Sequence, residues 1–292
     1  MPLFSICIPT YNRPLILKDV LDSIFSQSLD ISLYEVCVSD NAKTDENEMM
    51  IKEYFSAQPN LIYHRSNCEG FLNSIEALKL GKGLFLKLNN DTGKFYPGAL
   101  NIMAENFQKY KDEQSCVPFF MMSSDNVQRT FDDFDSFLYD ISYWSSWSSA
   151  FCIKKNNLET LLSQNVLLDK MFPHTSLLFG MTSETKYIID CYKYIETIEA
   201  GKKGGYNLPE TFGVRYIDML NDLFSDKKIS KRTLRKIKRD TITFITHWYL
   251  KTKKENDKYV YDFSHKEKYI LKSFGIIGLL LFYYYLLKFK IR

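Results

Sequence analysis

The segment LFLKLNNDTGKFYPG, residues Leu84 to Gly98, decides how this chain folds. It begins with alternating apolar residues, as a buried strand does, and then places Asn89, Asn90 and Asp91 in a row. A carboxylate at the end of a buried strand needs a partner or a metal ion. Open α/β sheets bind their ligands at the edge where the strands end. Two interpretations follow: a sheet-edge site in which Asp91 faces a divalent ion carrying a diphosphate, or a simple polar turn.

The chain before this segment alternates between apolar strand patterns and helical patterns. Strands are predicted at Phe4–Pro9, Tyr34–Asp40 and Leu61–His64, and helices from Pro14 to Phe25, over Lys43–Phe55 and over Asn73–Leu80. This β-α-β-α-β-α-β order with short connections predicts a mostly parallel sheet flanked by helices and joined by right-handed crossovers. The fold class is therefore α/β.

Polar residues follow three of these strands, at Thr10–Arg13, Asp40–Asn41 and Asn89–Asp91. In a parallel sheet these ends share one edge, so a polar ligand is expected there. No G-x-G-x-x-G follows the first strand, and no G-x-x-x-x-G-K-[ST] occurs, which argues against a dinucleotide fold and against a P-loop. With no glycine cradle, a metal ion on Asp91 is the simplest way to neutralise a diphosphate.

Composition supports a folded protein of the reducing cytoplasm. The chain has 292 residues, of which 45% are hydrophobic and 25% charged, and a net charge of +3. Its six cysteines form no C-x-x-C pair, which indicates reduced structural thiols. The start MPLFSICIPTYN lacks the features of a signal peptide. No nucleic-acid partner is expected.

Four successive motifs resemble one known family. FSICIPTYNRP, YEVCVSDNAKTDEN, RSNCEGF with Asn73, and KGLFLKLNNDTGKFYPGAL are similar, in order and spacing, to the N-terminal half of family 2 glycosyltransferases of the GT-A fold. The resemblance implies a nucleotide-sugar donor linked to UDP, dTDP or CDP. It implies that the donor nucleotide is bound by Pro9, Thr10, Tyr11, Arg13, Asp40, Asn41, Asn67, Gly70, Phe71, Asn73, Asn89 and Asn90.

The metal motif of that family, D-x-D, falls on Asn89-Asn90-Asp91. The resemblance therefore implies Mn²⁺ or Mg²⁺ bound by Asp91. An amide, Asn89, replaces the first carboxylate, and this departure implies a weakened or altered dependence on metal.

Two later segments, WSSWSSAFCIKKN and KMFPHTSLLFG, resemble the abequosyltransferase-like subset that builds bacterial surface polysaccharides. The family's usual Glu-Asp pair falls on Pro173-His174, so His174 is the first candidate for the general base and Asp169 the second. The alternative for His174 is a helix-face histidine bonded to the backbone. Trp144 and Trp147 are candidates for acceptor stacking or for core packing.

The C-terminal third has a different character. The transferase domain is predicted over residues 1–215 and a basic helical extension over residues 216–292, in which strand signals fade. Phe274–Leu287 is apolar on all sides and follows Lys272. Its fourteen residues reach only about 21 Å as a helix, short of the ~30 Å hydrocarbon core of a bilayer. We expect it to lie in the membrane interface, beside the lipid headgroups; a buried helix or a dimer interface is the alternative.

Three function classes follow from these features. The first is an inverting glycosyltransferase on the inner face of the cytoplasmic membrane, acting on a surface glycan or a lipid-linked glycan. The second is a degenerate family member that binds sugar or nucleotide without catalysis. A sugar nucleotidyltransferase is the third, and PTYNRP does not match the Gly-rich loop that such an enzyme carries after its first strand.

Overall fold

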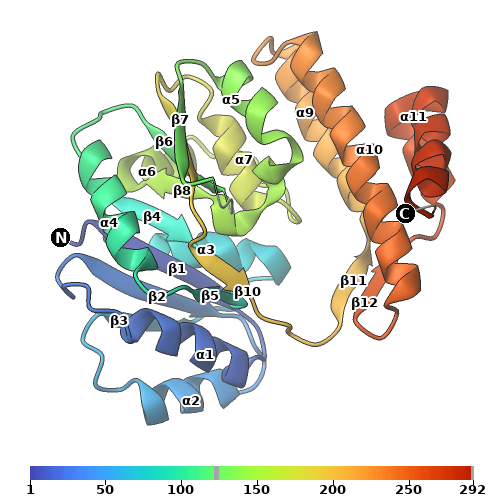
Figure 1. The fold of residues 1–292 in the computed structure, drawn as a ribbon. Coiled ribbons are helices and arrows are strands. Elements are labelled where there is room, and N and C mark those ends of the chain that lie inside the picture. The colour runs from blue at the N-terminus through green and yellow to red at the C-terminus, as the bar shows by residue number, and fades with distance from the viewer. Residues whose placement is uncertain (122–124, 291–292) are drawn as a thin grey trace. The chain divides into compact units, whose positions relative to one another are not determined.

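A five-stranded sheet forms the centre of the N-terminal part of the chain (Figure 1). The structure is a computed structural model that describes residues 1–121 and 125–290. The strands lie in the order β3-β2-β1-β4-β8. They are β1 (Phe4–Thr10), β2 (Tyr34–Asp40), β3 (Leu61–Arg65), β4 (Phe85–Leu88) and β8 (Cys152–Lys154). The first four run parallel to one another, and β8 pairs antiparallel with β4.

The helices that connect these strands are those expected from the sequence. They are α1 (Pro14–Phe25), α2 (Glu46–Tyr54) and α3 (Asn73–Leu80). Helix α1 begins at its proline, whose fixed φ suits a first helical turn. It packs against α2, while α3 packs against β1 and β2 (Figure 1). The predicted α/β class with a mostly parallel sheet is confirmed.

Aromatic side chains build the core between the sheet and α4 (Ala99–Tyr110). The Phe107 ring lies 4.5 Å from the Phe85 ring and 5.2 Å from the Phe4 ring, measured between centroids. Phe120 adds an edge-to-face contact with Phe107 at 5.4 Å. Aromatic pairs in these geometries are favourable beyond the burial of their area. They fasten β1 and β4 to the helix that follows the Leu84–Gly98 segment.

The remaining elements of this part form two smaller sheets and a helical layer. Strands β6 (Val117–Met121), β9 (Tyr187–Cys191) and β7 (Val127–Phe131) make one sheet, and β5 (Gly93–Phe95) pairs with β10 (Ile195–Thr197) in the other. The helices are α6 (Lys155–Ser163) and α7 (Pro173–Gly180).

The chain divides into two compact units. Unit 1 comprises Met1–Asp133 and Ser145–Glu199, and unit 2 comprises Phe134–Trp144 and Ala200–Arg292. The division predicted after residue 215 remains a prediction, and residues 291–292 of that extension lie outside the described residues. Unit 2 holds α5 (Phe134–Ile141), β11 (Lys203–Asn207), α8 (Leu208–Glu210), α9 (Tyr216–Ser225), α10 (Lys231–Lys254), β12 (Tyr259–Asp262) and α11 (Lys266–Lys290).

Two features of unit 2 differ from the sequence interpretation. Strand β12, which pairs with β11, lies where only helices were expected, because its four residues give too short a pattern to detect. Helix α11 is longer than the predicted apolar segment, and by length and composition Lys266–Phe289 suffices to cross a membrane. However, Gly275 has φ 67° and ψ −168° and interrupts the helix. The apolar half after this kink retains roughly the ~21 Å length expected from the sequence.

Gly83 supplies a stability prediction, because the connection from α3 to β4 passes directly over β1. A Cβ atom at residue 83 would lie 2.6 Å from the backbone carbonyl carbon of Phe4 and 2.7 Å from the backbone nitrogen of Ser5. We expect Gly83→Ala to lower the free energy of unfolding by about 1–3 kcal/mol, as overpacking against a rigid neighbour does. Urea denaturation monitored by circular dichroism measures this.

Gly213→Ala is the matched control, since its Cβ would meet nothing closer than 3.4 Å and the residue is helical. We expect that variant to be neutral or slightly stabilised. Equal loss of stability in both variants would contradict the steric explanation.

Candidate functional site

Asn73 joins the ends of β1 and β2 at the edge predicted from the sequence. Its Nδ2 donates hydrogen bonds to the backbone carbonyl of Ser39 at 2.8 Å and to that of Thr10 at 3.2 Å. Its Oδ1 accepts from the Ser39 hydroxyl at 2.7 Å. Asn73 itself is buried at the first position of α3. One amide therefore holds two strand ends and a helix start in fixed positions.

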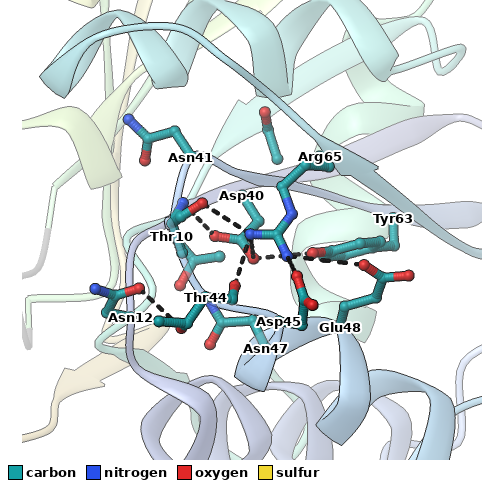
Figure 2. Close-up of polar contacts among 12 residues, drawn as sticks. Thr10, Asn12, Asp40, Asn41, Thr44, Asp45, Asn47, Glu48, Tyr63 and Arg65 are labelled. Carbon is teal, nitrogen blue, oxygen red and sulfur yellow. Dashed lines mark hydrogen bonds and ion pairs between the residues drawn. The ribbon is translucent and has the colours of Figure 1, made fainter.

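Asp40, at the end of β2, is fully buried and lies in a polar network (Figure 2). Its Oδ1 accepts from the backbone nitrogen of Ala42 at 2.8 Å, and its Oδ2 accepts from the Tyr63 hydroxyl at 2.9 Å. Burial and the neighbouring Asp40 carboxylate raise the pKa of Tyr63, so that the phenol remains a donor. A guanidinium nitrogen of Arg65 lies 3.9 Å from the Asp40 carboxylate.

Arg65 holds the loop after β2 in place (Figure 2). Its guanidinium donates to the backbone carbonyls of Ala42 at 2.7 Å and Thr44 at 2.6 Å, and to Asp45 Oδ1 at 2.6 Å. The sequence reasoning did not identify Arg65 or Tyr63 as part of the site. Tyr63 and Arg65 lie two residues apart on β3 and therefore on the same face, and β3 pairs with the strand that ends in Asp40. This spacing could have indicated that both side chains reach Asp40.

Asp91 receives two hydrogen bonds from the end of β1 and the loop that follows it. Its Oδ1 accepts from a guanidinium nitrogen of Arg13 at 2.9 Å, and its Oδ2 accepts from the Thr10 hydroxyl at 3.0 Å. Burial raises the pKa of Asp91, and the Arg13 charge and the Thr10 hydroxyl oppose that rise. The ends of β1 and β4 thus lie together, as predicted, and the Arg13–Asp91 ion pair connects them.

The two asparagines before Asp91 serve the fold of their own turn. Asn89 is fully buried, and its Nδ2 donates to the carbonyls of Asn90 at 3.0 Å and Gly93 at 2.8 Å. Asn90 Oδ1 accepts from the Ser148 hydroxyl at 2.6 Å, and its backbone nitrogen donates to the Ser149 hydroxyl at 3.0 Å. The Ser-rich sequence around residue 148 was the signal for this contact.

The other predicted nucleotide-binding residues lie on the loops of the same edge. Asn41 donates to the carbonyls of Cys68 at 3.1 Å and Gly70 at 3.3 Å, which fastens the loop after β3 to the end of β2. The remaining members of the set are half-buried Pro9, exposed Asn67, and the aromatic residues Tyr11 and Phe71, which are 48% and 52% exposed. The structure brings this predicted set to one edge of one sheet.

A divalent ion does not fit Asp91 in this arrangement. Both of its oxygens already accept hydrogen bonds, one of them from a guanidinium. Asn89 Nδ2 is bonded to the carbonyls of its own loop, while its buried Oδ1 has no hydrogen-bond partner. No group of three His, Cys, Asp or Glu that could hold a metal occurs in the part of the chain that the structure describes. An ion at Asp91 would lie beside the Arg13 charge, which opposes its binding.

His174 lies in the core at the start of α7. Its Nε2 is 3.0 Å from the backbone carbonyl of Ser146. A carbonyl only accepts, so Nε2 carries the proton. Burial lowers the pKa of His174 to about 4, and the bond to Ser146 opposes this only in part. Such a side chain is neutral at pH 7 but a weak proton acceptor.

Asp169 lies in the loop before α7 and is partly exposed. Its Oδ1 accepts from the backbone nitrogens of Met171 at 2.7 Å and Phe172 at 2.9 Å. The next residue, Lys170, forms an ion pair at 3.9 Å with Glu69, in the loop that follows β3. The loop carrying Asp169 therefore lies next to a loop of the candidate nucleotide edge.

The two tryptophans fall in different compact units. Trp147, in unit 1, is half-buried and packs against the hydrophobic core, as one of its two interpretations required. Trp144, in unit 2, is 42% exposed and stacks on Tyr143 with ring centroids 5.3 Å apart.

Solved structures of similar fold are GT-A glycosyltransferases. A mannosyltransferase from Pyrobaculum calidifontis, PcManGT, in complex with GDP-Man and Mn²⁺, has a TM-score of 0.59 and 14% identity, covering 98% of this chain and 87% of that one. S. aureus TarS 1-349 in complex with UDP-GlcNAc has a TM-score of 0.57 and 16% identity, covering 85% of this chain and 73% of that one. These likenesses show a GT-A fold.

The sequence profile of glycosyl transferase family 2 matches residues 5–161, and the chain belongs to that family. Abequosyltransferase RfbV of Salmonella typhimurium is 33% identical over 121 residues, which are 39% of this chain and 34% of that protein. Minor teichoic acid biosynthesis protein GgaB of Bacillus subtilis is 24% identical over 116 residues, which are 39% of this chain and 13% of that protein. The match thus spans about a third or less of each relative.

The buried His174 predicts a pH-dependent stability. Its folded-state pKa of about 4 lies below the ordinary value of 6.5, so the unfolded chain binds the proton more readily. Its contribution is complete above pH 6.5 and is lost as the pH falls toward 4, by up to about 3 kcal/mol. We expect His174→Gln to lose less unfolding free energy between pH 7 and pH 4 than the wild type does.

Urea titrations at several pH values measure this difference. His64→Gln is the matched control, because His64 is exposed on β3. We expect that variant to keep the wild-type pH dependence. The explanation is wrong if His174→Gln and the wild type lose the same stability over this range.

Proposed function

We propose that the protein is an inverting glycosyltransferase that moves a sugar from a nucleotide donor to a bacterial surface glycan. The observation that carries the proposal is the meeting of Thr10, Asp40 and Asp91 at one sheet edge, with Asn73 fixing the strand ends. Membership of glycosyl transferase family 2 supports it. The surface-polysaccharide and teichoic acid roles in the names of the two relatives support the class of acceptor.

The loops of this edge would bind the nucleotide. Asp40 offers a buried acceptor to a base N–H, and its bonds to Ala42 and Tyr63 keep the carboxylate in one orientation. Tyr11 and Phe71 offer exposed aromatic faces on the neighbouring loops. The base of the donor would therefore be bound by side chains on loops that the contacts of Arg65 and Asn41 hold in place.

Inversion requires a base that deprotonates the acceptor hydroxyl as its oxygen attacks the anomeric carbon, while the bond to the nucleoside diphosphate breaks. Asp169 suits this role better than His174. It is partly exposed, lies in a loop next to the nucleotide edge and is positioned by two backbone bonds on a single oxygen. His174 is buried, and the proton that it holds on Nε2 is bonded to Ser146.

A panel of UDP-, dTDP-, CDP- and GDP-sugars tests the proposal and the base together. We expect calorimetry to show that one nucleoside diphosphate binds, and we expect that donor to be consumed when a glycan acceptor is supplied. Asp169→Asn preserves the oxygen that accepts from Met171 and Phe172. It should lower kcat by roughly 10²–10⁴-fold with nucleotide affinity unchanged, because only the proton acceptor is lost.

His174→Gln is the matched control and should retain most of the transfer rate. If Asp169→Asn is active and His174→Gln is folded but inactive, His174 is the base. If no nucleoside diphosphate binds, the glycosyltransferase proposal is wrong. If nucleotides bind and no donor is consumed, the chain is a binding member of its family, the second class that the sequence suggested.

We further propose that unit 2 places the enzyme on the inner face of the cytoplasmic membrane, where a lipid-linked glycan would be the acceptor. Exposed apolar residues recur at helical spacing along α11 after its kink, at Ile276, Ile277, Leu280, Tyr283, Tyr284 and Leu287. Only 17% of the most apolar window of α11 is buried inside the protein. Exposed Lys and Arg on α10 and at Lys268, Lys272 and Lys288 supply the charge that anionic lipid headgroups attract.

Vesicle binding tests the membrane proposal. We expect the full chain to sediment with vesicles of phosphatidylcholine and phosphatidylglycerol, and less with phosphatidylcholine alone. Leu280 is 66% exposed, and Leu280→Asp should weaken binding roughly ten- to a hundredfold, since it removes one inserted leucine. Leu167→Asp, at an apolar residue of unit 1 that is 91% exposed, is the control and should bind as the wild type does. The proposal is wrong if the chain does not sediment with vesicles and instead dimerises through α11.

A further inference from the structure

We propose that the guanidinium of Arg13, held by Asp91, supplies the positive charge that faces the donor diphosphate, so that the donor binds without a divalent ion. This inference rests on the proposed function and deepens it. It assigns to a side chain the role that the sequence resemblance gave to Mn²⁺ or Mg²⁺. The disagreement between the Asp91 contacts and a metal site motivates it.

The Arg13 guanidinium is bonded to Asp91 on one side and faces solvent on the other. Its guanidinium nitrogen lies 2.9 Å from Asp91 Oδ1, and its side chain is 40% exposed while that of Asp91 is 8% exposed. A guanidinium carries five N–H donors, and Asp91 occupies one of them in the described contacts. The remaining donors are left for a ligand that approaches from solvent.

The backbone of Arg13 is fixed as well. It directly precedes Pro14, the first residue of α1, and its backbone nitrogen donates to Asn47 Oδ1 at 3.3 Å. Thr10 binds the second oxygen of Asp91 at 3.0 Å. The start of α1, the end of β1 and the turn after β4 therefore hold the guanidinium in place together.

Charge and ligand chemistry both favour the guanidinium over a divalent ion here. The Asp91 carboxylate is already compensated by the Arg13 charge, and a planar guanidinium matches two phosphate oxygens in a fork. Mg²⁺ is usually held by one or two carboxylates together with the substrate phosphates. In this site the first carboxylate of the family motif is the Asn89 amide, which is bonded to its own loop, and the second is paired with Arg13.

Nucleotide binding with and without metal tests the inference. The nucleoside diphosphate that binds best in the donor panel is titrated into the full-length chain in EDTA and in Mn²⁺. We expect wild-type affinities within about threefold of each other. Arg13→Ala should weaken binding in EDTA by roughly ten- to a hundredfold, the range of a lost hydrogen bond to a charged group. Arg13→Lys keeps the positive charge but lacks the paired N–H donors of the guanidinium. Its affinity for the nucleotide should fall between those of the wild type and Arg13→Ala.

Paramagnetic resonance of Mn²⁺ gives a second readout that does not depend on activity. We expect the spectrum of Mn²⁺ with nucleotide to be the same with and without the wild-type protein. In Arg13→Ala the Asp91 carboxylate is released, and with nucleotide this variant should bind Mn²⁺ and recover part of its affinity. Arg239→Ala, which removes an exposed arginine of α10, is the matched control for these two solution measurements and should bind nucleotide, and leave the Mn²⁺ spectrum, as the wild type does.

Two outcomes would overturn the inference while leaving the glycosyltransferase proposal intact. The first is wild-type nucleotide binding that is lost in EDTA and restored by Mn²⁺. The second is tight metal-free binding that is unchanged in Arg13→Ala. Failure of every nucleoside diphosphate to bind, with or without Mn²⁺, would instead contradict the proposed function itself.

Discussion

The geometry of the candidate site depends on one buried amide. Parallel strands alone bring their ends to the same edge, but nothing in a sheet fixes how the chain leaves that edge. Asn73 does so by bonding the last carbonyl of β1, the Ser39 carbonyl of β2 and the Ser39 hydroxyl, while it opens α3. Since the donors and acceptors of this amide are buried, losing any partner would leave an unpaired polar group in the core. The loops that bear the predicted nucleotide-binding residues start from these fixed points.

The negative charges of the two aspartates at this edge have different partners, and the two side chains therefore have different roles. Asp40 is bonded mainly to neutral donors, a backbone amide and a phenol, with the Arg65 charge at 3.9 Å. It is therefore an acceptor kept in position. Asp91 is paired directly with the Arg13 charge at 2.9 Å. It is therefore the anchor of a cation, and that cation rather than the carboxylate is exposed to solvent.

Unit 2 contains both a packed aromatic cluster and a set of exposed apolar residues. Its aromatic residues cluster around Trp248, whose ring meets those of Tyr259 at 5.1 Å and Tyr261 at 5.2 Å, so β12 is fastened to α10. By contrast, Ile276, Ile277, Leu280 and Leu287 of α11 remain exposed, although Phe282 on the same helix is buried against Tyr249. A helix packed inside a soluble domain would have most of its apolar residues buried. Because most of those named here are exposed, we connect this segment with a lipid surface.

Much of the fold was predictable because it rests on short-range patterns. Apolar strands at Phe4–Thr10, Tyr34–Asp40 and Phe85–Leu88, with helices between them, determine a parallel sheet and place its polar ends together. The four motifs then identified the family. Local patterns could not detect β12, because a four-residue strand has no distinctive periodicity.

What only the tertiary structure decided is the state of each polar side chain. His174 and Asp169 read alike in the sequence as candidate bases, yet one is buried against the Ser146 carbonyl and the other is partly exposed beside the nucleotide edge. Asp91 read as a metal ligand, and its partner came from Arg13, far away in sequence. Burial and counter-charge set proton affinity and metal affinity, and both depend on neighbours that the chain brings together only when it folds.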